Sequence, residues 1–487
     1  MRRLLLFASV IMLAACSTEY EQPVEGVKSA SKNSFKVSEK EAIERLEKML
    51  SIFEPATRGK KRTIKEIIPR VRPQTRAYAA EIPDTMYYYV NFDDNDGYAI
   101  VAADERAIPI LALIDTGNYV PPQAHIDRTN AIVDSLDLIY PPEEDDDDFW
   151  CFQHEATFKT VEMIEDLCDG YISDLSPYSK EISYQDIVRQ VGPLLKTKWK
   201  QSFPYNARCQ NYLYLLLGYN DPNAPTDFTG YYISDDPRFD ICASSSYTSA
   251  TGCDALALAQ ICAYHQHPAR SPYDNHQYDW GCISNTTYLL AGEYSGYPNK
   301  YYLDSDWDLS IRKDVSEISH LIKTIGLASN TVYGVEESSS RVNWAKSAMN
   351  DILSYIAIKE KGFNEDNILN ELNSVRPIYI CGRTKNLRYG HAWVIDGYRQ
   401  FKISEYEVFY KDDSYNEELG RQIIQEYNTH YYHCNYGWGG TANGYYLAEL
   451  FKTKQGPEMP SDGEASGTTG EENFVKQFRC LYISPNK

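Results

Sequence analysis

The stretch 251–264 constrains this chain more than any other, because it predicts a helix that is apolar on nearly every face. Thr251 stands three residues before Asp254, which is the spacing of a capping box at a helix start. A helix of this kind should be buried, and its first turn then carries Cys253. Free backbone N–H groups and the helix dipole favour a negative charge there, so the sequence predicts a nucleophilic thiol. The alternative interpretation is that Cys253 is one more small buried hydrophobe.

A nucleophilic cysteine needs a base, and the chain offers one far downstream. His391 lies at the start of the run 389–397, whose pattern is typical of a β-strand. A third segment, 434–440, contains Asn435 next to aromatic and glycine residues. A base needs a third group to fix its tautomer, and the order Cys, His, Asn is that of papain-like peptidases. The three segments together are more specific than any one of them.

These segments resemble those of the streptopain family of secreted bacterial cysteine peptidases. The nucleophile segment of that family is T-G-C followed by an A-x-A-x-A-Q-I-like helix, and it is matched at 251–261. Its base segment, G-H-A-[FW]-V-I-D-G, is matched at 390–397, and its W-x-Q-x-x-P-Y-N segment at 199–206. Its N-W-G-W-G-G segment is matched at 435–440, except that Tyr436 replaces the first tryptophan. The resemblance runs from about Tyr88 to the C-terminus.

The resemblance implies a role for each site residue. Cys253 is expected to be the nucleophile, and His391 its general base and later acid. The side-chain amide of Gln201 is expected to form the oxyanion hole with the backbone N–H of Cys253. Asn435 is expected to orient His391, and Trp438 to pack beside the imidazole and keep water away. Tyr436 departs from the family pattern, with a smaller ring and a hydroxyl that needs a partner.

The sequence predicts an α+β fold with a papain-like arrangement of two lobes, a helical lobe followed by an antiparallel β lobe. Helical spacing recurs at 315–327 and 342–356, and strand patterns dominate from Ile378 onward. An α+β propeptide domain is expected at 35–180, ahead of a catalytic domain at 181–487. Its signals are a capping box at Ser38 and Glu41, helical spacing to Phe53, and a hairpin pattern over 87–103. A separate binding domain without an inhibitory role is the alternative for this first domain.

The N-terminus predicts export. Two arginines precede an apolar run that ends in Leu-Ala-Ala-Cys, which looks like a bacterial lipoprotein signal. We therefore expect a signal peptide at 1–15, a lipid on Cys16, and a polar tether at 16–34. The protein would then be anchored in the cell envelope, facing the periplasm or the exterior. An ordinary signal peptide with a chance cysteine is the alternative.

The composition of the chain restricts the classes of partner that it can bind. The net charge of −21 argues against nucleic acid, and a hydrophobic content of 43% is enough for a core. The expected partners are protein or peptide substrates, the chain's own propeptide as an inhibitor, and the membrane through the lipid. No cofactor or metal is expected, because zinc spacing is absent and the pair His265 and His267 is interpreted as structural.

Three hypotheses for the function follow. The first is an exported cysteine endopeptidase that is made as a zymogen. The second is a catalytically weak relative that acts as a surface binding or inhibitory protein. The third is an acyltransferase that uses the same thioester with an amine acceptor.

Three further segments have two interpretations each. The acidic run 143–148 is expected to be a solvated turn rather than a calcium site. The charged insertion at about 400–429 is expected to be an enlarged surface loop rather than a flap beside the cleft. The glycine-rich stretch 455–472 is expected to be mobile, and only the resemblance places it beside the active site.

Overall fold

The computed structural model describes residues 35–53, 62–71, 85–119, 150–151, 164–165, 167–172, 181–202, 204–209, 249–289, 313–333, 338–383, 390–410, 418–452 and 478–486. The predicted signal peptide and tether, with Cys16, lie outside these residues, as do the acidic run 143–148 and the glycine-rich stretch 455–472. Among the described residues, no helix is long and apolar enough to cross a membrane.

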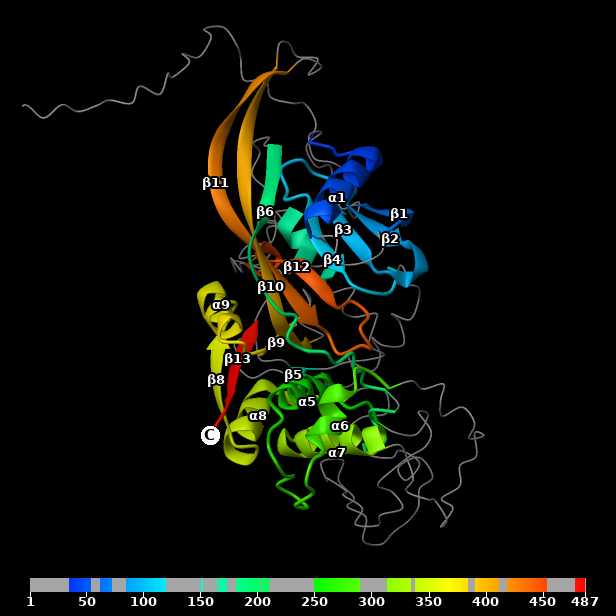
Figure 1. Cartoon of the computed structure of the whole chain (residues 1–487), viewed down its shortest axis with the longest axis vertical. Helices are drawn as coiled ribbons and strands as arrows, with labels where there is room; N and C mark the ends of the chain where they lie inside the picture. The colour runs from blue at the N-terminus through cyan, green and yellow to red at the C-terminus, as the bar shows by residue number, and fades with distance from the viewer. Residues whose placement is uncertain are drawn as a thin grey trace, which may run out of the picture.

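A long sheet and a group of helices form the two halves of the molecule in Figure 1. Within the described residues the sheet has 11 strands in the order β1-β2-β3-β4-β12-β11-β10-β9-β13-β8, and β6 pairs with β10 beside this path. All its pairings are antiparallel. The strands are β1 (Ile64–Val71), β2 (Thr85–Phe92), β3 (Tyr98–Ala102), β4 (Ile110–Ile114), β6 (Glu181–Val191), β8 (Tyr355–Lys361), β9 (Ile378–Arg383), β10 (Gly390–Tyr410), β11 (Glu418–Asn435), β12 (Gly444–Leu447) and β13 (Arg479–Pro485). The predicted α+β class with an antiparallel β lobe is confirmed.

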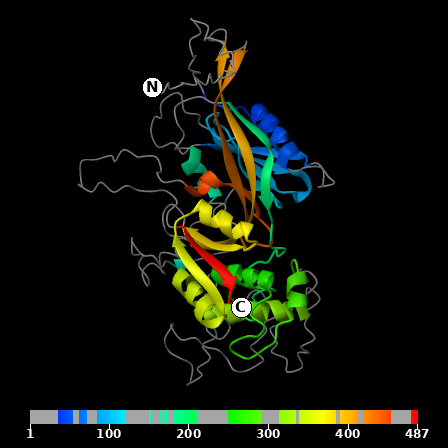
Figure 2. The same ribbon diagram turned by 60° about the vertical axis from the view of Figure 1, so that its left-hand side comes forward.

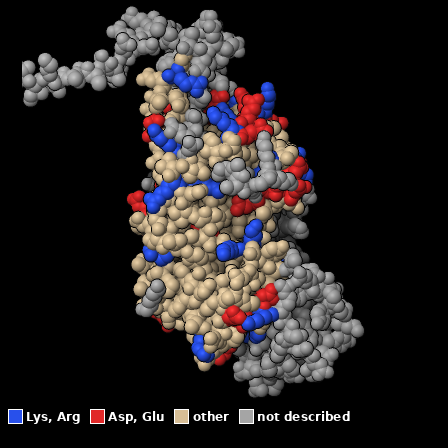
Figure 3. All heavy atoms as spheres, in the orientation of Figure 1, with Lys and Arg blue, Asp and Glu red and all other residues tan. Residues whose placement is uncertain are grey.

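The N-terminal part contributes helix α1 (Glu39–Phe53) and the first four strands to this arrangement. Helix α1 begins with the predicted capping box, because the Ser38 N–H donates to Glu41 Oε2 at 2.8 Å and the Glu41 N–H donates to Ser38 Oγ at 3.3 Å. Its predicted apolar face is buried against the sheet. On its outer face Lys40 Nζ lies 3.7 Å from Glu44 Oε1. Figure 3 shows acidic and basic side chains side by side on this part of the surface. The predicted hairpin is β2–β3, closed by a short 3-10 turn, η1 (Asp93–Asn95).

The helical half is built around α5 (Cys253–His265), with α6 (Trp280–Asn285), α7 (Lys313–Ala328) and α8 (Val342–Ser347) packed against it. Figure 2 shows the same division between sheet and helices after a turn of 60°. Every residue of α5 from Cys253 to Ala263 is buried, and α7 covers the predicted stretch 315–327. A second core therefore lies between these helices and the neighbouring parts of β8, β9, β10 and β13, and it is distinct from the core that α1 and the rest of the sheet share.

The predicted helix over 342–356 is too long. Helix α8 continues into a π-helical turn, η4 (Ala348–Ile352), and strand β8 then begins at Tyr355. Burial shows why: Tyr355 and Ala357 are 2% and 4% exposed, whereas Ile356 and Ile358 are 49% and 60% exposed. This alternation has the period of a strand and not of a helix.

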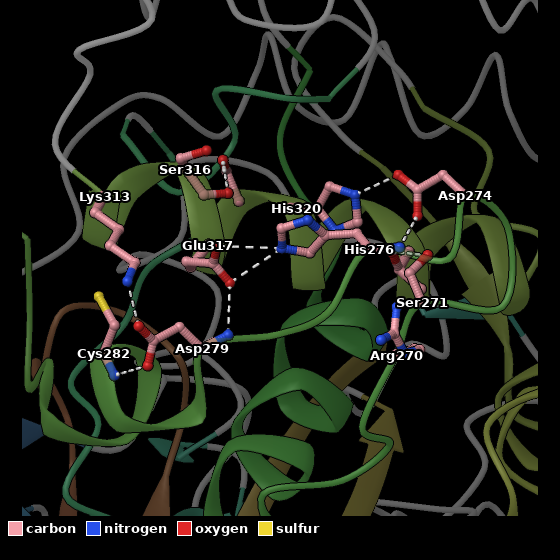
Figure 4. A network of polar contacts seen from close by, with 12 residues as sticks. Arg270, Ser271, Asp274, His276, Asp279, Cys282, Lys313, Ser316, Glu317 and His320 are labelled. Carbon is pink, nitrogen blue, oxygen red and sulfur yellow. Dashed lines mark hydrogen bonds and ion pairs between the residues drawn. The ribbon is translucent and has the colours of Figure 1, made fainter.

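A polar network fastens the segment after α5 to α7 (Figure 4). His276 Nε2 lies 3.1 Å from both carboxylate oxygens of Glu317, and His320 Nε2 lies 2.7 Å from Asp274 Oδ2. Asp279 accepts from the Cys282 N–H at 2.9 Å, which caps α6, and also pairs with Lys313. These contacts tie the segment after α5 and the start of α6 to α7.

The described parts of the charged insertion, 400–410 and 418–429, are strands and not loop, which corrects the sequence-based expectation. They form the far half of an antiparallel ladder between β10 and β11, which runs from Gln400↔His430 to Tyr410↔Glu418 with register shifts after Glu405 and after Phe409. Strand β6 pairs with the other side of β10, from Tyr398↔Val191 to Tyr406↔Glu181. Side chains alternate, so that Phe401 and Ile403 are fully buried while Lys402 pairs with Glu426 at the surface. The charged side chains on the exposed face of this ladder therefore explain why the composition of the stretch resembles that of a loop.

The N-terminal part is joined to this ladder in two ways. Strand β4 pairs with β12, so that both parts share one sheet. At the end of α1, Phe53 is fully buried in an aromatic pocket whose ring centroids lie 5.1 Å away for Phe401, 5.2 Å for Tyr431 and 5.3 Å for Tyr445. Arg399 covers the Phe53 ring at 4.9 Å and donates through Nη1 to the Phe53 carbonyl at 2.7 Å. We call this set of contacts the Phe53 pocket.

An ion pair lies at the same contact between the N-terminal part and the β lobe. His433 on β11 directs Nδ1 at Asp396 Oδ1, 2.5 Å away, and Nε2 at Asp115 Oδ2, 3.1 Å away. Burial by itself lowers the pKa of His433, but the carboxylates of Asp396 and Asp115 outweigh it and raise that pKa to about 10. The imidazole is therefore charged at neutral pH and links the N-terminal part to the β lobe.

This pair predicts how stability depends on pH. The pKa of His433 is about 10 in the folded protein and about 6.5 in the unfolded chain. The ion pair therefore stabilises the fold fully below about pH 6.5, and this stabilisation is lost as the pH rises through about 10. Asp115→Asn should therefore lower the free energy of unfolding by about 1 kcal/mol near pH 6, with a deficit that shrinks towards pH 10. Thermal melts of the full chain across this range measure it. The exposed Asp351→Asn is the control, and a deficit that does not change with pH would contradict the assignment.

Candidate active site

The cysteine lies at the very start of its helix. The N-cap is Gly252, with φ +83°, and Cys253 is the first residue of α5. The predicted capping box does not form, because no side chain caps this helix, and Asp254 accepts instead from the Tyr379 hydroxyl of β9. A residue with a Cβ would be strained at Gly252, so the turn there fixes how the chain enters the helix. Cys253 is 2% exposed.

His391 lies near the start of β10, and its ring has a defined tautomer. Nε2 lies 2.9 Å from the carbonyl oxygen of Tyr436, so this nitrogen carries the proton and donates. Nδ1 is buried and has no hydrogen-bond partner among the described residues. Burial lowers the pKa of His391 to about 3, against the opposing effect of the Tyr436 carbonyl. The neutral ring therefore keeps Nδ1 available as a proton acceptor.

Aromatic rings enclose the imidazole. The Trp438 centroid is 4.8 Å from that of His391, and Tyr436 and Trp393 lie 6.0 and 6.1 Å away. Trp438 thus lies where the sequence predicts it. Tyr436 also stacks on Trp393 at 5.3 Å, so the smaller ring still completes the wall. These rings exclude water from one side of the base, which is consistent with its low pKa.

Asn435 does not hydrogen-bond to the imidazole, which departs from the expectation that its side chain orients His391 directly. Its Nδ2 donates to the Thr197 carbonyl at 2.7 Å, and its Oδ1 accepts from the Gly437 N–H at 3.2 Å. The carboxamide therefore fixes the turn that carries the Tyr436 carbonyl. An ordering role for Asn435 stays a prediction, and it would act through the backbone of this turn.

Gln201 is buried beside the nucleophile segment. Its backbone carbonyl accepts from the Thr251 N–H at 3.1 Å, two residues before Cys253. Its side chain is nearly inaccessible, yet neither Oε1 nor Nε2 has a hydrogen-bond partner among the described residues. Two residues earlier, the Trp199 carbonyl accepts from the Gly439 N–H at 2.9 Å. The 199–201 segment therefore contacts both the nucleophile segment and the turn behind the base.

The two halves of the molecule approach closely at this point. Gly437 has φ +76°, and a Cβ there would lie 2.9 Å from Leu256 Cδ2 of α5. Ala392 and Val394 of β10 belong to the same core as α5. Glycine at 437 thus allows the turn behind His391 to touch the helix that carries Cys253, and the close contact sets their separation.

Strand β5 (Trp150–Cys151) lies where these halves meet. It pairs with β7 (Ser340–Arg341) of the helical half, with Trp150 opposite Arg341 and Cys151 opposite Ser340. It also contacts β10, the strand of His391. Figure 1 places the β5 label between the sheet and α5. A segment of the predicted propeptide domain therefore spans both lobes of the predicted catalytic domain.

One contact at this site, between Tyr379 and Asp254, could not be predicted from the sequence. Tyr379 lies in an apolar strand, where a buried tyrosine is unremarkable, and Asp254 was interpreted as a cap. Their hydrogen bond joins residues 125 positions apart in the chain. The pair His265 and His267 lies elsewhere, with His267 Nε2 3.0 Å from the Ser354 carbonyl and the pKa of His265 lowered to about 4 by burial.

Comparison with known proteins identifies relatives. Streptopain from Streptococcus pyogenes is 26% identical over 258 residues, which are 47% of this chain and 52% of streptopain. The thiol protease/hemagglutinin PrtT from Porphyromonas gingivalis is 21% identical over 390 residues, 76% of this chain and 35% of PrtT. The chain thus spans about half the length of streptopain and about a third of PrtT.

Two solved structures from Prevotella intermedia also match. A prointerpain A fragment with a cysteine-to-alanine mutation is 16% identical, with a TM-score of 0.43 over 86% of this chain and 98% of the fragment. Active interpain A is 17% identical, with a TM-score of 0.33 over 61% of this chain and 98% of that protein.

Family models cover most of the described site. The Spi protease inhibitor model matches residues 34–138, which include α1 and strands β1 to β4. The Peptidase C10 family model matches residues 199–446, about half of the chain. That range contains Gln201, Cys253, His391, Asn435 and Trp438. The chain therefore belongs to the Peptidase C10 family.

Proposed function

We propose that this protein is an exported cysteine endopeptidase made as a zymogen. Cys253 attacks the carbonyl carbon of a peptide bond and forms a thioester, while the amine leaves with a proton from His391. Water, deprotonated by His391, then releases the acid and restores the thiol. The substrates are proteins or peptides, consistent with the names of the relatives streptopain and PrtT.

The side chain of Gln201 carries this proposal. A buried carboxamide without a partner costs free energy, so a fold that keeps one generally uses it on a ligand. Its Nε2 donor, together with the Cys253 N–H at the helix start, would bind the oxyanion of a tetrahedral intermediate. Amide donors on a developing negative charge support acyl transfer rather than a purely structural role for Cys253.

Inhibition by the N-terminal part is supported by three contacts. Strand β5 bridges the two lobes, the Phe53 pocket holds α1 on the β10–β11 ladder, and β4 continues the catalytic sheet through β12. Thr116 also donates through Oγ1 to the Gly440 carbonyl at 3.0 Å, two residues from Trp438. A segment so placed would restrict substrate access until it is cut from the chain.

The test of this function is hydrolysis of a denatured protein under reducing conditions. Mass spectrometry then identifies the cleaved bonds and any new N-terminus of the protein itself. We expect cleavage that depends on Cys253 and a cut between the N-terminal part and residue 199. An added amine that appears on the products in place of water would instead support the acyltransferase hypothesis. Binding to the protein without any cleavage would support a catalytically weak relative.

A lipid anchor on Cys16 is a further part of the proposal, based on the Leu-Ala-Ala-Cys signal. Two or three acyl chains anchor a protein stably where one does not. Cys16→Ser should therefore block processing or release the protein from the membrane fraction, as read by fractionation and by the mass of the N-terminal peptide. Ser17→Ala is the matched control. Unchanged membrane association of Cys16→Ser would contradict the anchor.

A further inference from the structure

Two lysines, Lys198 and Lys200, lie beside the turn that carries Trp438. They alternate with buried residues along the segment 197–201, so both face its outer side, where they are half-buried. Lys200 also directly precedes Gln201, whose side chain is the proposed oxyanion donor. The reaction proposed above uses neither lysine.

The stems of both lysines lie across the glycines at the end of this turn. A Cβ at Gly440 would lie 3.0 Å from Lys198 Cδ, and a Cβ at Gly439 would lie 3.9 Å from Lys200 Cδ. The Gly439 N–H donates to the Trp199 carbonyl at 2.9 Å, so the backbone between the two lysines is fixed to the same turn. Glycine at 440 thus leaves room for the first stem. The apolar stems cover the turn, and the ammonium groups reach its solvent edge.

The charge of these two ammonium groups is not offset locally. Neither forms an ion pair with a carboxylate of the described residues. The sequence contains no Asp or Glu from 187 to 220 and none from 434 to 448, although the net charge of the whole chain is −21. Burial lowers the pKa of Lys200, which shows that its charge is partly removed from water. A half-buried cation of this kind favours an anionic ligand.

The proposed reaction determines which part of a substrate lies near these lysines. The carbonyl oxygen of the cleaved bond faces Gln201 and the Cys253 N–H, and the leaving amine takes its proton from His391. The residues after the cleaved bond therefore lie on the side of His391. Trp438 packs on that imidazole with ring centroids 4.8 Å apart, and the two glycines that contact the lysine stems follow it directly.

We propose that Lys198 and Lys200 form a cationic subsite, which binds the carboxylate of Asp or Glu at one of the first two substrate residues after the cleaved bond. This inference rests on the proposed function and adds a substrate class to it, namely proteins and peptides with an acidic residue just after the cleaved bond. In the uncut chain the N-terminal part lies on the same turn, because Thr116 Oγ1 donates to the Gly440 carbonyl at 3.0 Å. Trimming of the N-terminal part therefore uncovers this side of the turn.

Matched peptides test the subsite after an added protease has trimmed the N-terminal part. The peptides differ only at the first or the second position after the cleaved bond, where they carry Glu, Gln or Lys. We expect kcat/KM for the Glu peptide to exceed that for the Gln peptide by about fivefold, through KM rather than kcat. Because salt screens such a pair, the preference should shrink between about 0.05 and 0.5 M salt. Equal values for the Glu and Gln peptides at both positions would overturn the proposal.

Charge variants assign the preference to the lysines. Lys200→Gln should remove most of it and Lys198→Gln part of it, whereas Lys200→Glu should reverse it, so that the Lys peptide is cleaved faster than the Glu peptide. The matched control is Lys402→Gln, since Lys402 lies at the surface of the far ladder and pairs with Glu426. This control should keep the full preference. If the preference for Glu survives in Lys200→Glu, the lysines serve solubility alone and the proposal is wrong.

Peptide binding separates this inference from the proposed function. Trimmed Cys253→Ala protein cannot form the thioester, so fluorescence anisotropy gives Kd for the intact Glu and Gln peptides. We expect the Glu peptide to bind about fivefold more tightly. If this difference is present but the unaltered protein cleaves neither peptide, the proposed function fails and the subsite stands. If both peptides are cleaved equally well and bind equally well, the proposed function stands and the subsite is refuted.

Discussion

Cys253→Ala and His391→Ala are each expected to leave no detectable peptide hydrolysis, whereas Gln201→Ala should retain a measurable rate. Loss of the nucleophile or of the base removes the reaction path itself. Loss of one oxyanion donor raises the barrier by about 2.7–4 kcal/mol, roughly a hundred- to a thousandfold in rate, and the Cys253 N–H remains. The measurement is the initial rate on a peptide substrate after an added protease has trimmed the N-terminal part.

Matched controls separate chemistry from folding. Cys282→Ala removes a partly exposed thiol, and Gln277→Ala removes an exposed carboxamide, so neither should change the rate. Each variant needs a thermal melt close to that of the unaltered chain. If maturation is autocatalytic, Cys253→Ala should also accumulate as uncut precursor. Full activity in a folded Cys253→Ala protein would overturn the proposed mechanism.

Phe53→Ala should activate the uncut chain. The fully buried ring is held by Phe401, Tyr431, Tyr445 and Arg399, all from the ladder and its neighbour β12. Replacing a buried phenylalanine with alanine lowers the free energy of unfolding by about 3–5 kcal/mol. Here much of that loss weakens the contact between α1 and the β10–β11 ladder. We expect hydrolysis by the uncut protein to rise tenfold or more, up to the rate of the trimmed enzyme.

The control for this variant is Phe35→Ala. Phe35 is also buried, but it contacts Arg106 and accepts from the Glu105 N–H, both of which belong to the N-terminal part itself. Arg399→Ala removes a contact to the same pocket from the ladder side, so it should activate the uncut chain as well. Gel analysis must show that the chain stays uncut during the assay. A Phe53→Ala protein as inactive as the unaltered uncut chain, yet active after trimming, would contradict inhibition through this pocket.

Much of the fold follows from local pattern. The capping box at Ser38 and the spacing of apolar residues to Phe53 predict α1, and the alternating runs around Gly97 predict the β2–β3 hairpin. The buried helix α5 follows from its nearly continuous apolar run. In each case the deciding interactions lie within a few residues along the chain, where periodicity reports them directly.

The predictions failed where long-range pairing decides. The charged stretch 400–429 resembles a loop in isolation, and its described parts, 400–410 and 418–429, form sheet because β6 and β11 supply partners on both sides of β10. Similarly, helical spacing ran past Ile352 because the strand alternation in β8 is set by β13. The composition of such a stretch reflects its exposed face, and it does not indicate which strands pair with it.

By itself, the sequence singled out the residues that we propose carry the chemistry, because Cys253, Gln201 and His391 occur in motifs whose spacing is local. The tertiary structure alone decided how these residues are held. It placed the Tyr436 carbonyl, and not the Asn435 side chain, on His391, and it set the Asp254 carboxylate against Tyr379. It also brought Arg399 to the carbonyl of Phe53, 346 residues away in the chain. The physical reason is that hydrogen bonds and ring contacts depend on distances in space, which sequence separation does not report.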